Sequence, residues 1–195
     1  MQESRASTRW RVVLFLWLVL LLFALLVLSF PRWVTLFYPL PHKEFVIKYA
    51  EQFKIDPYLV FAIIKAESRF RAEARSPKGA RGLMQIMPET ARWIAQQMNR
   101  PHFREEHLDD PQVNIEMGCW YVASLVKEFG GRLPPAVAAY NAGRGNVRKW
   151  LIEGVWDGSE ETADDIPFVE TRRYVKAVLT DYEIYRTIYR GTDYR

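Results

Sequence analysis

The chain has 195 residues, enough for one compact domain and a targeting segment. An apolar fraction of 49% and a formal charge of only +4 argue against a disordered chain. The basic excess is mild and lacks dense basic patches interleaved with aromatic residues, so nucleic-acid binding is not indicated. It would suit an anionic surface such as a cell wall or lipid head groups. Cys119 is the single cysteine, which excludes an intrachain disulfide and, in its apolar surroundings, predicts a buried thiol.

An uncharged, apolar segment spans residues 12–31, about the length that a helix needs to cross a bilayer. Aromatic residues, which are frequent at membrane interfaces, lie toward both ends of it: Trp10, Trp17, Trp33 and Tyr38. Basic residues are concentrated on its N-terminal side: Arg5, Arg9 and Arg11, against Arg32 and Lys43 after it. This bias predicts residues 1–11 in the cytoplasm and the remainder of the chain outside.

Three other interpretations of this segment fit the sequence less well. A cleaved signal peptide has a shorter apolar core and a small-residue cleavage site, whereas residues 25–33 have the sequence LLVLSFPRW. No cysteine stands at the end of the segment, which excludes a lipoprotein anchor. A buried helix of a soluble domain is disfavoured because the segment is apolar on every face. We therefore expect an uncleaved, single-pass anchor.

The rest of the chain has the pattern of one mainly helical domain, residues 43–195, after a short, stiff linker at residues 32–42 that is rich in proline. Asp-Pro pairs at 56–57 and 110–111 predict helix starts, and Gly130-Gly131 predicts a helix end. The expected helices span residues 43–53, 56–70, 88–98, 110–130, 134–142, 146–153 and 167–189. Loops are expected at 71–82 and 154–165, and a small hairpin is compatible with residues 71–84.

Glu67 is the first candidate for chemistry. It shares one helical face with Val60, Ile63, Ile64 and Phe70, at spacings of three and four residues. A carboxyl at the edge of an apolar stripe is partly buried, which raises its pKa above the free value of about 4.3. Protonation of a glycosidic oxygen requires such an acid. The alternative is an exposed glutamate that pairs with a residue such as Arg71.

Three further segments combine apolar and hydrogen-bonding residues in a way that is typical of ligand clefts. Residues 76–91, SPKGARGLMQIMPETA, place Gln85 among apolar side chains in a loop with two glycines. Residues 138–143 place Tyr140 and Asn141 at a helix end. Residues 166–174 place Glu170 in a first helical turn, where helix capping would also explain it.

Together the segments ESRF (67–70), SPKGARGLMQIMPETA (76–91), AAYNAGRGNVRKWL (138–151) and IPFVETRRYVKAVL (166–179) resemble the soluble lytic transglycosylase domain. The resemblance covers residues 45–189 and implies a mainly α, goose-type lysozyme-like fold. It implies Glu67 as the only catalytic carboxylate. The cleft residues that it implies are Ser76, Met84, Gln85, Tyr140, Asn141, Glu170 and Tyr174. For Asn141 a structural role at the helix end has equal weight.

The activity implied by this resemblance is cleavage of the β-1,4 bond between N-acetylmuramic acid and N-acetylglucosamine in peptidoglycan. Glu67 would protonate the leaving oxygen and then take a proton from the C6 hydroxyl, which closes a 1,6-anhydro ring. Goose-type lysozymes carry an acid just before the GLMQ segment, and the loop SPKGARG has none, which favours this reaction over hydrolysis. Acids from elsewhere, such as Asp109, Asp110 or the 160–165 cluster, could still fold inward.

Three alternatives stay open at this point: a hydrolytic muramidase of the same fold, a non-catalytic glycan-binding module tethered to the membrane, and a scaffold in a secretion or division machine. No metal or other cofactor is expected, because His42, His102 and His107 lack the spacing of metal ligands. The expected partners are peptidoglycan strands and, through the N-terminal helix, the lipid bilayer.

Overall fold

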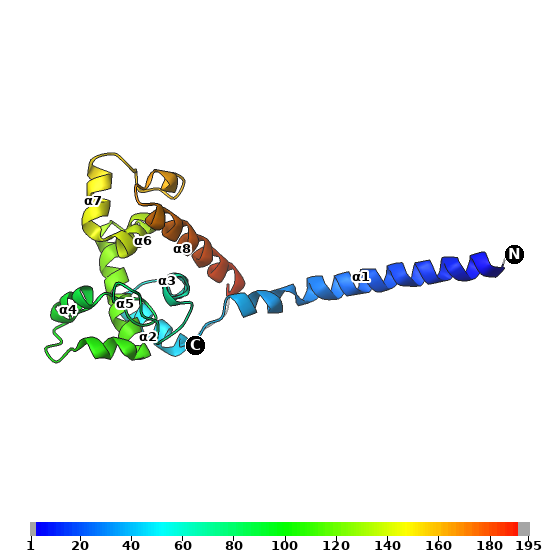
Figure 1. The fold of residues 1–195 in the computed structure, drawn as a ribbon, viewed down its shortest axis with the longest axis horizontal. Helices are drawn as coiled ribbons and strands as arrows, with labels where there is room; N and C mark the ends of the chain where they lie inside the picture. Colours follow the sequence, from blue (N-terminus) through cyan, green and yellow to red (C-terminus); the bar gives the residue numbers. More distant parts are fainter. Residues whose placement is uncertain (1–2, 191–195) are drawn as a thin grey trace. The chain divides into compact units, whose positions relative to one another are not determined.

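The computed structural model describes residues 3–190, except for the side chains of residues 3–9 and 28–34. It divides into two compact units, Met1–Pro39 and Leu40–Arg195. The first unit is the single helix α1 (Glu3–Phe37) (Figure 1). Within the described residues, this is the one helix that is long and apolar enough to cross a membrane.

Helix α1 continues past Pro31, where the sequence predicted its end. A proline inside a helix removes one backbone hydrogen bond, but its fixed φ is itself helical, so the neighbouring turns can carry the helix through. Only five residues, 38–42, separate α1 from the first helix of the second unit. The prediction that a linker begins at residue 32 is therefore wrong in its first half.

The second unit contains α2 (Lys43–Phe53), α3 (Pro57–Ser68), α4 (Pro88–Gln97), α5 (Pro111–Glu128), α6 (Leu133–Ala142), α7 (Arg144–Ile152) and α8 (Val169–Ile188), with short 3₁₀ helices η1 (Glu105–Asp109) and η2 (Ala163–Asp165). No strand occurs among residues 3–190; the loop that was compatible with a hairpin has only isolated bridges, Arg75 with Arg81 and Arg81 with Ile86. The mainly helical class is confirmed.

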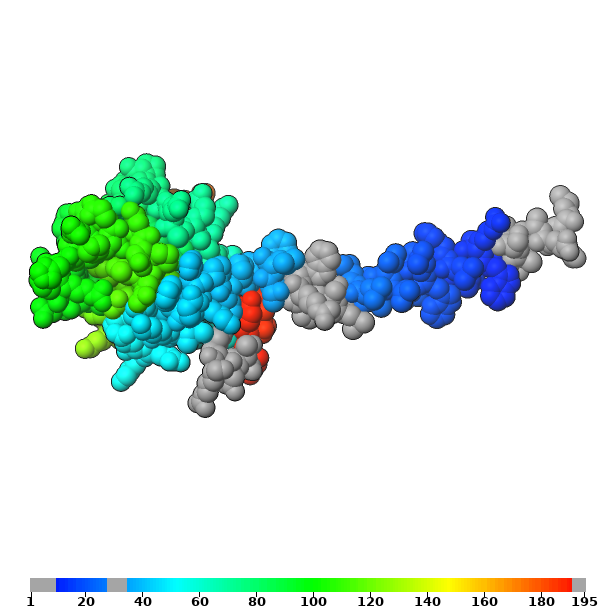
Figure 2. Space-filling model, turned by 90° about the horizontal axis from the view of Figure 1, so that it is seen from below, coloured from blue at the N-terminus to red at the C-terminus, as the bar shows by residue number. Residues whose placement is uncertain are grey.

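Helix α5 packs against α2, α4, η1 and α6, while α3 packs between α2 and α8, and α6 joins α7 and α8 (Figure 1). The space-filling view shows α2, in cyan, beside green residues on one face of this unit (Figure 2). The large side chains that are fully buried between these helices include Phe61, Ile63, Leu83, Met84, Ile115, Met117 and Tyr185. The single cysteine, Cys119, is also fully buried, and burial raises the pKa of its thiol, as expected for an inert group.

Side-chain contacts near both ends of α3 fix the position of this helix. Asp56 caps the helix by accepting a hydrogen bond from the Tyr58 amide at 2.9 Å, as the Asp-Pro pair predicted. Lys65 pairs with Asp181 of α8 at 2.6 Å, and the Tyr182 hydroxyl of α8 donates to Asp56 at 3.0 Å. Helices α3 and α8 therefore lie in a defined register.

A pair of glycine substitutions tests the packing around α5. The side chain of Met84 crosses α5 at Gly118, where an added Cβ would lie 2.1 Å from the Met84 sulfur. We expect Gly118→Ala to lower the free energy of unfolding by about 1–3 kcal/mol through overpacking. Gly145→Ala, in α7, meets no atom within 4 Å and should stabilise by up to about 1 kcal/mol through helix propensity. Chemical denaturation measures both values, and equal effects of the two changes would contradict this packing.

Candidate active site

Glu67 lies in the last turn of α3, with Ile63, Ile64 and Ser68 buried beside it. The sequence predicted that this helix ends at Phe70, but it ends at Ser68. Arg69 and Phe70 both adopt left-handed backbone angles, with φ of 50° and 62°, which stop the helix. This early end leaves Glu67 partly exposed in the turn that follows the buried residues Leu59–Ile64. A carboxyl in this position can be reached by a ligand while most of its hydration is lost.

The electrostatic surroundings of Glu67 raise its pKa from 4.5 to about 7. The largest cause is burial, which disfavours the charged carboxylate. The hydroxyl of Tyr174 acts in the opposite direction by favouring the carboxylate, and the negative charge of Glu170 adds to the rise. The pKa of Glu67 is thus raised, as the sequence predicted, and its carboxyl can carry a proton near neutral pH.

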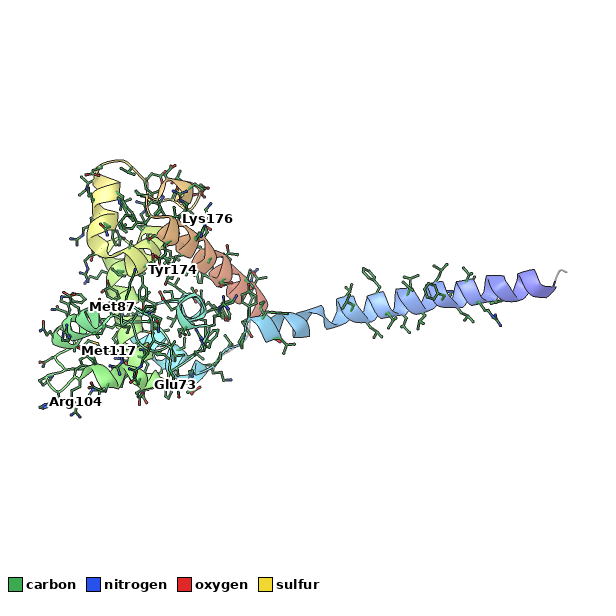
Figure 3. The ribbon with its side chains drawn as sticks, viewed as in Figure 1. Glu73, Met87, Arg104, Met117, Tyr174 and Lys176 are labelled. Carbon is green, nitrogen blue, oxygen red and sulfur yellow. The ribbon has the colours of Figure 1, made fainter. Side chains whose placement is uncertain are left out.

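Two buried phenols accompany this carboxyl. Tyr174 extends from the first half of α8 (Figure 3), and its buried hydroxyl, although it acts electrostatically on Glu67, makes no hydrogen bond of ordinary geometry within the described residues. The Tyr140 hydroxyl donates to the carbonyl of Met84 at 2.7 Å. Burial, and secondly the charge of Glu67, raises the pKa of both phenols. They therefore stay protonated as hydrogen-bond donors beside the acid.

The loop before α4 is held in place by Asn114, a fully buried residue of α5. Its amide oxygen accepts from the Met84 backbone N–H at 2.8 Å, and its amide nitrogen donates to the carbonyls of Arg81 and Leu108, each at 2.9 Å. Gly82 permits this close approach, since an added Cβ would lie 2.1 Å from the Asn114 amide nitrogen. The backbone of the GLMQ segment, residues 82–85, is thereby held in place by α5.

Met84 was predicted as a cleft residue, and its side chain is instead completely buried against Gly118. Its backbone carbonyl, which binds Tyr140, is the part that contributes to the site. The sequence pattern does not distinguish these roles, because an apolar side chain in a loop can line a cleft or anchor the loop to the core. Here the small residue at position 118 provides the space for anchoring.

Gln85 adopts a left-handed backbone conformation with φ of 45°, which turns its side chain back over the loop. Its amide nitrogen donates to the carbonyls of Ala74 and Gly82, at 2.9 and 2.8 Å. These two bonds use both amide protons and leave the amide oxygen as the group available to a ligand. The strained backbone angle is thus compensated by two hydrogen bonds.

A groove of about 240 Å³ runs between the GLMQ segment and the end of α6. Its lining combines apolar and polar side chains: Gln85, Ile86, Met87, Thr90, Tyr121, Tyr140, Asn141, Ala142 and Gly143. Met87, labelled in Figure 3, is 39% exposed at its edge. Glu67 is not among the lining residues; it is linked to the groove through Tyr140, with which it interacts electrostatically.

The remaining predicted site residues, Asn141, Glu170 and Ser76, lie in different surroundings. Asn141 lines the groove and accepts a hydrogen bond from the buried Thr171 hydroxyl at 2.7 Å, so it joins the end of α6 to α8. Glu170 is exposed, and its charge acts on Glu67. Ser76 lies apart from the groove lining: its hydroxyl accepts from the Ala80 amide at 2.9 Å and closes a turn of the loop. The structure therefore gives Ser76 a local structural role.

Three of the acids that could have supplied a second carboxylate, Asp109, Asp110 and Asp164, interact with other residues. Asp109 pairs with Arg81 and Arg75, at 2.5 and 2.8 Å. Asp110 caps α5, and Asp164 pairs with Lys176 at 2.7 Å. Within the described residues, Glu170 is the one carboxylate that contributes to the raised pKa of Glu67.

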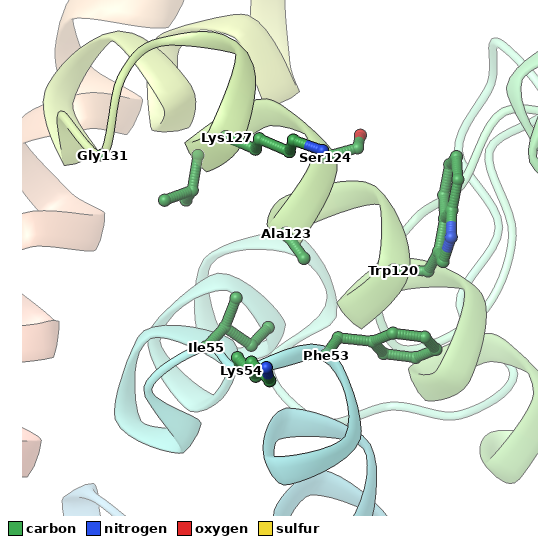
Figure 4. A pocket seen from close by; sticks show the side chains of 9 residues that line it. Phe53, Lys54, Ile55, Trp120, Ala123, Ser124, Lys127 and Gly131 are labelled. Atoms are coloured by element: carbon green, nitrogen blue, oxygen red, sulfur yellow. The ribbon is translucent and has the colours of Figure 1, made fainter.

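A larger hollow of about 470 Å³ lies between the end of α2 and α5, and Figure 4 shows its lining. Phe53, Trp120, Lys54 and Lys127 contribute to it, and no carboxyl does. Despite its size, this hollow contains no group that could serve as a general acid near neutral pH. Glu67 does not interact with this hollow; it interacts with Tyr140, which lines the smaller groove.

Sequence reasoning missed Asn114, Thr171 and Tyr121. A signal for Asn114 was present: it is a polar residue at helical spacing from Gly118, Tyr121 and Leu125, all on the buried face of α5. A polar side chain on such a face must find partners, and loop carbonyls are the usual ones. The role of Tyr121 depends on which helices meet, and no local pattern indicates that.

The comparisons with known proteins agree with this geometry. Residues 44–161 match the family model of the transglycosylase SLT domain, and residues 165–193 match the soluble lytic transglycosylase helical domain. The chain belongs to the SLT transglycosylase family. It is 37% identical over 156 residues to the soluble lytic murein transglycosylase of Escherichia coli K12, which covers 79% of this chain and 24% of that protein.

Other relatives are similar in sequence or structure. Membrane-bound lytic murein transglycosylase C of Serratia proteamaculans is 30% identical over 162 residues, 72% of this chain and 45% of that protein. The crystal structure of the 70 kDa soluble lytic transglycosylase of Escherichia coli superposes with a TM-score of 0.73 at 36% identity, over 77% of this chain and 25% of that one. A complex of the 70 kDa soluble lytic transglycosylase with bulgecin A superposes with a TM-score of 0.72 at 34% identity, over 79% of this chain and 25% of that one. The lysozyme-like fold is thus confirmed, and the chain spans about a quarter of the soluble relatives' length.

The raised pKa of Glu67 has a consequence for stability. The unfolded carboxyl loses its proton near pH 4.5 and the folded one near pH 7, so the folded state binds more protons in between and stability falls as pH rises through this window. Glu67→Gln has no charge to bury. We expect it to be more stable than the wild type at pH 8, by at most about 3 kcal/mol, and to lose this advantage below pH 4.5. Denaturant unfolding across pH measures the difference.

Glu73→Gln, the same change at an exposed carboxyl of the following loop, is the control. A stability difference between wild type and Glu67→Gln that stays constant from pH 4 to pH 8 would contradict the buried position of Glu67.

Proposed function

We propose that this protein is a lytic transglycosylase that cuts the β-1,4 bond between N-acetylmuramic acid and N-acetylglucosamine in peptidoglycan. The observation that carries the proposal is the carboxyl of Glu67, partly buried beside two protonated phenols and with a pKa raised to about 7. An acid with this pKa carries a proton near neutral pH, and it can release the proton and take it up again at little cost in free energy. Family membership and the murein-cleaving relatives support the same reaction.

In the proposed reaction Glu67 donates its proton to the glycosidic oxygen, and the bond between that oxygen and C1 of the muramic residue breaks. The acetamido group of the same residue stabilises the positive charge that develops at C1. The Glu67 carboxylate then removes the proton from the C6 hydroxyl, whose oxygen bonds to C1 and closes the 1,6-anhydro ring. The proton returns to Glu67, so no water is consumed and one carboxylate suffices.

The neighbouring residues have roles that follow from their contacts. Tyr174 stabilises the carboxylate after the first proton transfer, because its hydroxyl lowers the pKa of Glu67. Tyr140, held by the Met84 carbonyl, lines the groove beside Glu67 and orients the sugar next to the acid. Gln85 and Asn141 line the groove as hydrogen-bonding groups for sugar hydroxyl or acetamido groups. Glu170 keeps Glu67 protonated in the free enzyme by its charge.

Helix α1 supports membrane association, as does the similarity to membrane-bound relatives. We infer that it spans the membrane once, with the short basic N-terminus in the cytoplasm and the catalytic unit outside. The described side chains of residues 10–27 are exposed and apolar apart from Arg11, which fits a lipid environment. Peptidoglycan is outside the cytoplasm, so this orientation places the active site with its substrate.

The reaction predicts a specific product. Purified peptidoglycan digested by the wild-type protein should give fragments that end in 1,6-anhydro-N-acetylmuramic acid, and Glu67→Gln should lower the rate by at least about a thousandfold while folding is retained. Mass spectrometry distinguishes the anhydro product from the hydrolysed one by the mass of one water. Reducing ends in place of anhydro ends would identify a hydrolytic muramidase. Unchanged turnover by Glu67→Gln would remove Glu67 from the mechanism.

The proposed topology is tested in cells. The full chain should stay in the membrane fraction after carbonate extraction, and protease added to spheroplasts should degrade the catalytic unit. Leu20→Arg, which places a charge at the centre of the apolar segment, should weaken retention, whereas Leu20→Ile should not. A catalytic unit that is protected until the cells are lysed, or a mature N-terminus beyond residue 31, would contradict an uncleaved anchor with this orientation.

A further inference from the structure

The two walls of the groove each contribute one side-chain amide. Gln85 belongs to the GLMQ segment and Asn141 to the last turn of α6, and both residues line the groove. A side-chain amide has a donor end, its NH₂ group, and an acceptor end, its oxygen. Which end of each amide faces a ligand therefore decides which chemical groups the groove can bind.

The hydrogen bonds of Gln85 turn its acceptor end to the groove. Its amide nitrogen donates to the carbonyls of Ala74 and Gly82, so both of its N–H groups are used. Its amide oxygen accepts no hydrogen bond from the part of the chain that the structure describes. The wall formed by the GLMQ segment thus presents an acceptor.

A hydrogen bond from Thr171 gives Asn141 the opposite orientation. Thr171 is the third residue of α8, and its hydroxyl donates to the Asn141 amide oxygen at 2.7 Å. Because this bond turns the oxygen toward α8, the NH₂ group is the end of the amide that is left for a ligand. Within residues 3–190 that NH₂ group donates to no protein group. The wall formed by the end of α6 thus presents a donor.

Thr171 is well suited to hold an amide in one orientation. Its side chain is 1% exposed, so its hydroxyl cannot exchange Asn141 for water, and its β-branched side chain is restricted to few rotamers. Helices α6 and α8 pack against each other, which keeps the two residues at bonding distance. Thr171 does not itself line the groove, so any effect that it has on a ligand must pass through Asn141.

An acceptor and a donor on facing walls match a secondary amide. The carbonyl and the N–H of a planar trans amide point in opposite directions, so the carbonyl can accept from Asn141 while the N–H donates to Gln85. The acetamido group of a sugar is such an amide, and its methyl group would contact Ile86 or Met87 of the lining. A protonated free amine has three donors and no acceptor, and it leaves the donor of Asn141 without a partner.

We propose that Thr171 is a positioning residue that, through Asn141, makes the groove select sugars that retain an acetamido group over sugars with a free amine. The inference rests on the proposed function, because it takes the N-acetylated sugars of peptidoglycan as the ligand. Helix α8 thereby takes part in the choice of substrate through a residue that does not touch it.

Calorimetric binding to soluble glycan strands tests this selection. The full chain in detergent carries Glu67→Gln to prevent cleavage, and the strands, freed of peptides by an amidase, are used before and after a deacetylase has exposed their amines, at a pH where the amines are protonated. We expect the parent protein to prefer the N-acetylated strands by about tenfold or more. Chemical re-acetylation of the treated strands should restore their binding.

Two substitutions of Thr171 separate its hydroxyl from its packing. Thr171→Val keeps the shape of the side chain and removes the donor, so it should weaken binding of N-acetylated strands by about fivefold and reduce the preference. Thr171→Ser retains the hydroxyl and should retain the preference. An unchanged preference in Thr171→Val, or equal losses in the two variants, would overturn the proposal, and so would a parent protein without preference.

Asn141→Asp tests the orientation of the amide independently of Thr171, because it replaces the donor with an acceptor. It should shift the preference toward the deacetylated strands. Asn99→Asp, the same change at an exposed asparagine outside the groove lining, controls for the added charge and should leave the preference as it is. Equal shifts in both variants would contradict the proposed orientation. A protein that shows the expected preferences, but whose wild-type form releases no anhydro products, would contradict the proposed reaction alone.

Discussion

The candidate active site depends on the partial burial of one carboxyl. Glu67 follows the buried residues Leu59–Ile64 of α3, and the phenols of Tyr140 and Tyr174, from α6 and α8, interact with it. The burial of this acid raises its pKa to about 7, at a cost in stability above that pH. Lys65 and Asp181, and Asp56 and Tyr182, hold α3 in register with α8 against this cost.

The opposite side of the site is stabilised from α5. Asn114 fixes the backbone of the GLMQ segment by three hydrogen bonds, Gly118 makes room for the Met84 side chain, and Tyr140 bonds to the Met84 carbonyl. Gln85 can then adopt its strained backbone angle and face the groove. Asn114 and Gly118, which do not line the groove, therefore position residues that do, as is usual where the geometry of a site must be preorganised.

The groove has the composition of a site for a neutral, hydroxyl-rich ligand. It offers the amide groups of Gln85 and Asn141 and the phenol of Tyr140, with Ile86 and Met87 as apolar neighbours. Glu67 does not line the groove, and Tyr140 is the residue that both lines the groove and interacts with this acid.

The sequence alone determined the helices, since Asp56 and Asp110 cap them, Gly130-Gly131 ends one, and apolar spacing sets their buried faces. It also indicated Glu67 and its raised pKa, because that residue lies on an apolar helical face. Only the tertiary structure decided that the Met84 side chain lies in the core against Gly118. The same holds for Asn114, whose partners Arg81 and Met84 lie about thirty residues away in the sequence. Local spacing specifies the face of a helix, but which faces meet depends on packing that forms only when distant segments come together.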